Sequence, residues 1–207
     1  MKKLSLFIAS FLFSLATFCQ GLIGMPTSLI IVYNYPGNYF YIRLEGTDKR
    51  KTDQSTVFLL DNRPVQVLAI NKNTFLTDTI KHSSPEEIIK TYIKWESDYI
   101  KKTFNFDISN KTEALKTVTG ADVVFWAYDM PDQKPVEKAD SAVTASTQKQ
   151  MFVLRLVKDY VIGINMPLFD ADQYENNKAY LLRNIDNIVI SLKEIDLEEL
   201  NRQLNKQ

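Results

Sequence analysis

Histidine and cysteine, two of the residue types that most often build metal and nucleophile sites, occur once each in this chain of 207 residues. His82 is the single histidine, and a solvated loop imidazole is the simplest interpretation of it. Asp170, Asp172 and Glu175 cluster at the entry of a predicted helix, where their oxygens could hold a hard cation. Acids in a first helical turn also complement the helix dipole, so we expect no metal there. One histidine and one cysteine are too few for a structural zinc site.

Aromatic side chains gather in two predicted strands. Tyr39 and Tyr41 belong to an N-terminal hairpin, and Trp126 and Tyr128 share one face of a later strand. Such rings could form a platform for a sugar or peptide, and these four residues are our candidate ligand surface. Aromatic residues are also good strand formers and core fillers, and ordinary packing is the favoured interpretation.

Motifs for nucleotide and nucleophile chemistry are absent from the sequence. It contains no Gly-x-Gly-x-x-Gly, no Walker loop and no Gly-x-Ser-x-Gly elbow, which disfavours dinucleotide, nucleoside triphosphate and α/β-hydrolase chemistry. No local pattern singles out a carboxylate pair for glycoside hydrolysis. We therefore assign no catalytic residue and expect no cofactor.

Three short patterns concern modification. Thr79 in Asp-Thr-Ile and Ser141 in Asp-Ser-Ala fit an Asp-hydroxyl-apolar pattern that resembles the O-glycosylation signal of some Gram-negative exported proteins. Asn110 begins an Asn-Lys-Thr pattern for N-glycosylation, which matters only in a host with that machinery.

The N-terminus is typical of a secretory signal peptide. Lys2 and Lys3 precede an apolar run to Phe18, which is shorter than the ~20 residues that span a bilayer. We expect residues 1–19 to be removed by cleavage between Cys19 and Gln20, leaving a periplasmic or extracellular chain without cysteine. The alternative is a lipid anchor on Cys19, although bulky Phe18 stands where lipoprotein signals want a small residue. Loss of two lysines makes the formal charge of zero slightly negative, so no nucleic-acid partner is expected.

Hydrophobic periodicity and turn signals divide the rest of the chain into strands and helices. The predicted strands are Thr27 to Asn34, Tyr39 to Glu45, Thr56 to Leu60, Pro64 to Ile70, Asp122 to Asp129, Gln150 to Val157 and Tyr160 to Met166. A helix with a Ser84 capping box should run to about Lys102, a second from about Ala171 to Lys193, and a short terminal one after Asp196.

This order predicts the fold class. Strands, a helix, more strands and a final helix favour an α+β fold, a mostly antiparallel sheet flanked by helices, in one domain covering residues 20–207. The strands from Asp122 and Gln150 are apolar at successive positions, so both faces of the sheet should be covered there. The polar stretch near 130–149 should be a mobile loop.

The helix opening Ser84-Pro85-Glu86-Glu87-Ile88, the strand pair from Gln150 to Met166 and the helix through Leu181-Leu182-Arg183-Asn184-Ile185 resemble the PsbP-like superfamily. The resemblance implies an α-β-α sandwich and a non-enzymatic binding or assembly protein. It offers no functional residues to carry over, and Tyr35-Pro36-Gly37-Asn38-Tyr39 is only a loose analogue of the family's Pro-x-x-Trp-like motif.

Two functional hypotheses follow. The first is an exported binding or assembly module of the cell envelope that presents a rigid sheet to a protein or small ligand. The second is a small exported hydrolase or metal-assisted enzyme that uses carboxylates. A concave site with converging acids would favour the enzyme.

Overall fold

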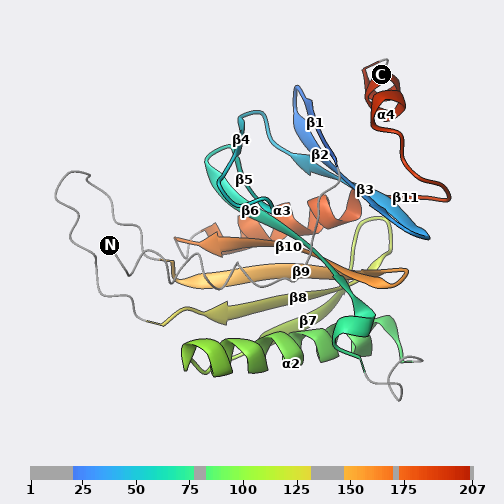
Figure 1. The fold of residues 1–207 in the computed structure, drawn as a ribbon. Helices are drawn as coiled ribbons and strands as arrows, with labels where there is room; N and C mark the ends of the chain where they lie inside the picture. Colours follow the sequence, from blue (N-terminus) through green and yellow to red (C-terminus); the bar gives the residue numbers. More distant parts are fainter. Residues whose placement is uncertain (1–20, 77–82, 132–146, 170–172, 206–207) are drawn as a thin grey trace, which may run out of the picture.

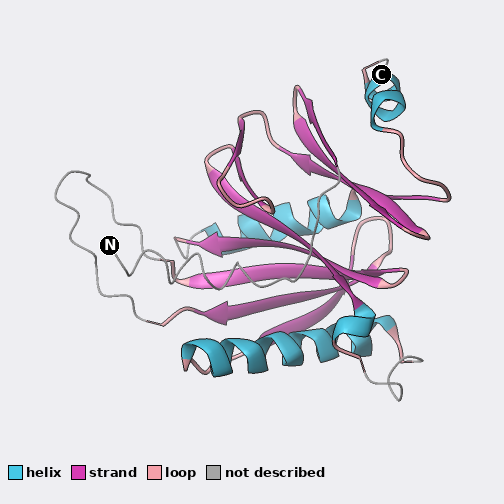
Figure 2. Ribbon diagram, in the orientation of Figure 1, coloured by secondary structure: helices cyan, strands magenta, loops and turns pink. Residues whose placement is uncertain are grey.

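The computed structural model describes residues 21–76, 83–131, 147–169 and 173–205. Within these residues two antiparallel sheets pack against each other, and helices lie on the outer faces and beside the smaller sheet (Figure 1, Figure 2). The predicted α+β class, with antiparallel sheets flanked by helices, is confirmed. The sheet is divided in two, which the sequence did not indicate.

The larger sheet has seven strands in the order β4-β5-β6-β10-β9-β8-β7. Its strands are β4 (Lys49–Lys51), β5 (Val57–Leu60), β6 (Arg63–Asn71), β7 (Lys111–Lys116), β8 (Asp122–Asp129), β9 (Lys149–Val157) and β10 (Tyr160–Leu168). The apolar runs of β8 and β9 are buried on both faces, as predicted. The predicted tight hairpin joins β9 to β10 through Lys158, whose φ is 53°.

The smaller sheet has the order β1-β2-β3-β11. Its strands are β1 (Gly21–Met25), β2 (Ser28–Tyr35), β3 (Asn38–Glu45) and β11 (Ile188–Ser191). The predicted hairpin is β2 and β3, joined at Pro36-Gly37. Gly37 has a φ of 73°, a conformation that favours glycine in such a turn.

Three α-helices are described, each on its own apolar face. Helix α2 (Pro85–Phe104) covers one face of the larger sheet, and α3 (Tyr174–Asp186) and the smaller sheet share the other face. Helix α4 (Leu197–Leu204) lies on the outer face of the smaller sheet, where Leu200 meets Ile23, Ile30 and Val32. A 3-10 turn, η1 (Lys72–Thr74), follows β6. The main core lies between the sheets.

The start of α2 agrees with the sequence. Ser84 Oγ accepts from the Glu87 N–H at 3.3 Å, and Glu87 Oε2 accepts from the Ser84 N–H at 2.9 Å. With Pro85 in the first turn, this is the predicted capping box. The helix ends at Asn105, which is left-handed with a φ of 51°.

The second predicted helix is wrong at its C-terminal end. Helix α3 stops at Asp186, and Ile188 to Ser191 form strand β11 on the edge of β3. The apolar period continues through Ile188, Val189 and Leu192, which suggested more helix. A run of β-branched residues beside an available strand edge pairs as a strand instead.

Besides β11, three edge strands were not predicted. β4 and β7 are rich in charged residues, and β1 contains two glycines in five residues. Such strands lack the apolar alternation that marks a half-buried strand, and their pairing to a neighbour is what forms them.

Candidate functional site

A polar groove opens where the ends of β3 and α3 meet the β5–β6 turn. It has a volume of about 660 Å³. Its lining is predominantly polar and carries three guanidinium groups. The lining residues are Thr27, Arg43, Glu45, Gly46, Thr47, Asp61, Arg63, Tyr180, Arg183 and Asn187. We call it the arginine groove.

Helix α3 fixes the floor of the arginine groove by holding both backbone polar groups of Glu45. The Glu45 N–H donates to Asn184 Oδ1 at 2.7 Å, and the Tyr180 hydroxyl donates to the Glu45 carbonyl at 2.8 Å. Asn184 and Tyr180 are both buried, and burial raises the pKa of Tyr180 to about 12. The end of β3 is therefore anchored by uncharged partners.

The three arginines come from three elements. Arg43 on β3 donates from Nε to Ser28 Oγ at 3.1 Å, and Arg183 on α3 lies 3.5 Å from Glu45 Oε2. The Arg63 guanidinium lies 5.7 Å from the centre of the Tyr180 ring. Among the described residues, neither Arg43 nor Arg63 has a carboxylate oxygen within 4.0 Å. Two guanidiniums thus keep most of their donors available.

Asp61 forms no ion pair within 4.0 Å with these arginines. Its Oδ1 accepts from Asp48 N at 2.9 Å, from Thr47 Oγ1 at 2.8 Å and from Thr47 N at 2.9 Å. The backbone bond from Asp48 contributes most to lowering the pKa of Asp61, followed by the bond from the Thr47 hydroxyl, and the nearby charge of Arg63 also helps to lower it. Lys49 Nζ donates to the Thr47 carbonyl at 2.7 Å, next to the residue that bonds Asp61. Asp61 shapes the rim, and the cations outnumber the acids.

The chemistry of this arrangement is anion recognition. Guanidinium groups bind carboxylate and phosphate through planar, paired donors. The acids of the groove are already engaged, Asp61 by backbone N–H groups and Glu45 by Arg183. The groove therefore lacks the converging free acids that would favour the enzyme hypothesis.

The structure does not bring the four predicted aromatic residues together. Trp126 and Tyr128 are 0% and 4% exposed beneath α2, in a cluster with Phe152. The Trp126 Nε1–H donates to Asn110 Oδ1 at 2.7 Å. Tyr39 and Tyr41 are half-buried on β3, and Tyr41 packs in the cluster under α4. Two of the four rings thus have no surface to offer a ligand, because they fill the core.

A second polar region, which was not predicted from the sequence, lies between α2 and the larger sheet and contains Glu96 and Gln150. Burial raises the pKa of Glu96 to about 7. Burial also raises the pKa values of Tyr92 and Tyr128, and a negative charge on Glu96 would raise them further. Gln150 lies opposite Tyr128 in the β8–β9 pairing, and its buried amide has no hydrogen-bond partner among the described residues. The packing of α2 on the sheet should therefore depend on pH.

Several predicted positions lie outside the described residues: Cys19, Gln20, Thr79, His82, Ser141, Asp170 and Asp172. Most of the predicted loop near 130–149 lies outside them too. At its described ends, the Met130 N–H donates to the Gln148 carbonyl at 2.8 Å. Glu175 is exposed in the first turn of α3. Across the described ranges, His, Cys, Asp and Glu form no group of three or more that could hold a metal.

The three arginines were not predicted because no local pattern connects them. Arg43 is an outward residue of a strand, Arg63 follows a turn, and Arg183 lies on a helix. Their proximity depends on the packing of α3 against β3. In the part of the chain that the structure describes, no helix combines the length and apolar character needed to cross a membrane.

Comparisons with known proteins concern the fold. No protein-family model matches this chain, and no curated protein sequence matches it. The chain is similar to the solution structure of cyanobacterial PsbP (CyanoP) from Synechocystis sp. PCC 6803, with a TM-score of 0.48 and 10% sequence identity. The match covers 84% of this chain and 99% of that one. This likeness concerns the fold alone.

Proposed function

We propose that this protein is an exported, non-catalytic binding module that takes an acidic segment of a partner protein in the arginine groove. The observation that carries the proposal is the convergence of Arg43, Arg63 and Arg183 on one groove, with two of them lacking a carboxylate partner among the described residues. The groove is a rigid part of the fold, because buried Tyr180 and Asn184 hold its floor.

The exposure of the three arginines favours an acidic protein segment over a small anion. All three arginines are exposed residues, and an exposed ion pair contributes only about 0.2–1 kcal/mol. A single small anion would therefore be held weakly. A segment with several carboxylates could contact all three arginines at once, and the groove volume of about 660 Å³ is wide enough for side chains from an extended chain.

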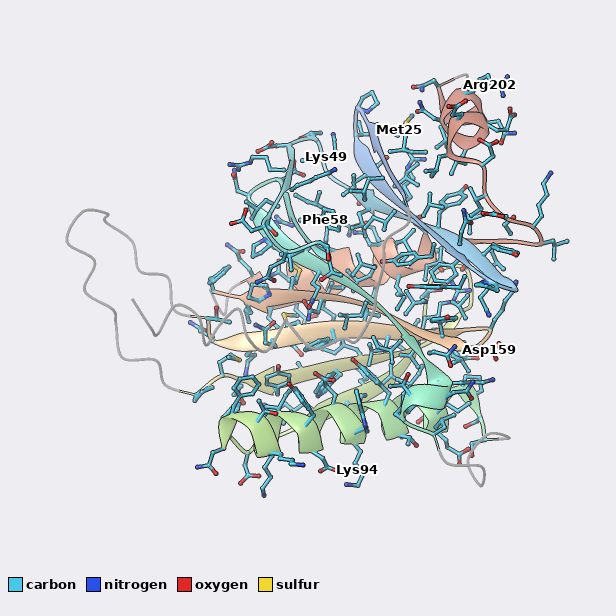
Figure 3. All side chains as sticks on the ribbon, viewed as in Figure 1. Met25, Lys49, Phe58, Lys94, Asp159 and Arg202 are labelled. Carbon is cyan, nitrogen blue, oxygen red and sulfur yellow. The ribbon has the colours of Figure 1, made fainter. Side chains whose placement is uncertain are left out.

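The test is the binding of a fluorescein-labelled hexaglutamate peptide, followed by fluorescence anisotropy. Arg43→Gln and Arg63→Gln should each raise the Kd roughly 1.5- to 5-fold, the equivalent of one exposed ion pair. Arg202→Gln is the matched control, because Arg202 lies on α4 and pairs with Glu199 rather than lining the groove (Figure 3). It should leave the Kd unchanged.

Salt and phosphate sharpen this test. Affinity should fall between about 0.01 M and about 0.15 M salt, where the screening length shortens from ~30 Å to ~8 Å. Inorganic phosphate at the same charge concentration should compete poorly. Equal losses in all three variants would mean non-specific attraction and would overturn the assignment of the groove. Strong competition by phosphate would replace the acidic segment with a small anion.

Export is the second part of the proposal, supported by Lys2, Lys3 and the apolar run that follows them. It is tested by the intact mass of the protein from the envelope fraction of its own cell. A mass beginning at Gln20 supports cleavage, and hexose-sized additions would point to Thr79 or Ser141 as acceptors. A mass beginning at an acylated Cys19 would show a lipid anchor instead.

A further inference from the structure

The edges of the two sheets differ in how they are protected. The edge strands β4 and β7 each carry three charged side chains, a common protection against pairing with another chain. Strand β1 has α4 beside it, with Leu197 packed over Gly21. Strand β11 has neither defence, because its sequence is Ile-Val-Ile-Ser.

Strand β11 is also accessible. Val189 is 44% exposed and Ile190 is 45% exposed, although both are large apolar residues in a strand, whereas the side chain of Ile188 is buried in the main core. Leu192, just beyond the strand, is 98% exposed. Apolar residues exposed together along an edge strand are typical of an interaction site.

Hydrogen-bond alternation identifies the free backbone groups of this edge. The Arg43 N–H donates to the Asn187 carbonyl at 3.2 Å, and the register pairs Val189 with Tyr41. In an antiparallel pair the bonds alternate, so Asn187, Val189 and Ser191 face β3. The N–H and C=O groups of Ile188 and Ile190 therefore point away from β3, and no hydrogen bond to them is found within the described ranges.

We propose that two copies of this protein associate through antiparallel pairing of their β11 strands, with the two-fold axis at Val189. In that register Ile188 of each copy exchanges two hydrogen bonds with Ile190 of the other, which uses all four free groups of each strand. The two smaller sheets then become one continuous sheet.

The same register matches the side chains. Val189 meets its own copy across the axis on the outer face, and Ile190 meets Ile188 on the inner face. The Val189–Val189 and Ile188–Ile190 pairs are apolar, and Ser191 falls opposite Asn187. No like charges oppose each other within the strand, because β11 has no charged residue. The pairing covers Val189 and Ile190, the two side chains of the strand that are exposed in the single chain. This self-complementarity selects a second copy over a different partner.

The interface is one short strand, so the dimer should be weak and reversible. The experiment is sedimentation equilibrium of the purified protein at rising concentration. The weight-average mass should climb from one chain toward two. Hydrogen exchange at the same concentrations should show increasing protection of the Ile188 and Ile190 amides, which do not bond to β3.

Val189→Lys places like charges opposite each other at the axis and should weaken association at least tenfold. Val118→Lys is the matched control, because Val118 is 96% exposed on the turn before β8 and should change nothing. Ile190→Pro removes an outward N–H without touching the β3 bonds, and it should also weaken association if the variant keeps its far-ultraviolet circular dichroism. A monomeric mass at all concentrations, or equal weakening by Val189→Lys and Val118→Lys, would overturn the proposal.

Discussion

Replacing Glu96 by Gln should stabilise the protein in a way that grows with pH. Glu96 lies on α2 near Tyr92 and Tyr128, and burial raises its pKa from 4.5 to about 7. An ionised carboxyl with that displacement costs the folded state on the order of 3 kcal/mol. Gln has nearly the same shape and carries no charge at any pH.

The sign of the effect follows from proton binding. Below about pH 4.5 the carboxyl is protonated in both folded and unfolded chains, so it adds no cost. Between about pH 4.5 and 7 the folded protein keeps a proton that the unfolded chain has lost, so the free energy of unfolding falls as the pH rises. Above pH 7 both states are ionised and the cost is complete. The nearby tyrosines titrate above this window, because their pKa values are also raised.

The assay is urea unfolding at a series of pH values from 4 to 8, followed by tryptophan fluorescence. The difference in unfolding free energy between Glu96→Gln and the parent should grow by about 2–3 kcal/mol across that range. Glu175→Gln, at an exposed position on α3, controls for loss of one charge. A difference that stays constant with pH, or one that shrinks, would refute the reasoning.

Three further changes test the positions that organise the fold. Tyr180→Phe should lower the free energy of unfolding by about 1–2 kcal/mol, because the Glu45 carbonyl loses its donor, and it should weaken hexaglutamate binding. Urea unfolding and fluorescence anisotropy measure the two effects. An unchanged stability would contradict the anchoring role of Tyr180. Ser84→Ala should cost about 1 kcal/mol in thermal or urea unfolding by removing the N-cap, whereas Ser84→Gly should cost only a few tenths. Trp126→Phe should lower the free energy of unfolding by about 1–3 kcal/mol, because Phe cannot donate to Asn110 and leaves a cavity beneath α2. A loss of stability with unchanged peptide affinity would match a core residue, and a loss of affinity would restore the ligand-surface hypothesis.

Sequence reasoning succeeded where structure is local. The β2–β3 hairpin follows from its turn at Pro36-Gly37, and α2 follows from the Ser84 capping box. Both signals lie within a few residues of what they determine, so no knowledge of packing was needed. The burial of Trp126 and Tyr128 was also implied by the sequence, because β8 is apolar at successive positions and both its faces had to be covered.

Sequence reasoning failed where the outcome depends on distant segments. Residues Ile188 to Ser191 continue the apolar period of α3, and only the free edge of β3 makes them a strand. The arginine groove depends in the same way on Tyr180 and Asn184 holding Glu45, which is more than a hundred residues away in the chain. No local pattern in a single sequence reveals contacts between residues so far apart in the chain.

Asn187 connects the arginine groove to strand β11. It is the single residue between α3 and β11, its N–H donates to the Asn184 carbonyl, and its own carbonyl accepts from Arg43. A shift of the helix end would therefore move a groove-lining arginine and the pairing strand together. If a ligand in the groove alters this connection, linkage requires that strand pairing alter ligand affinity by the same factor, so the concentration of the protein itself would tune what it binds.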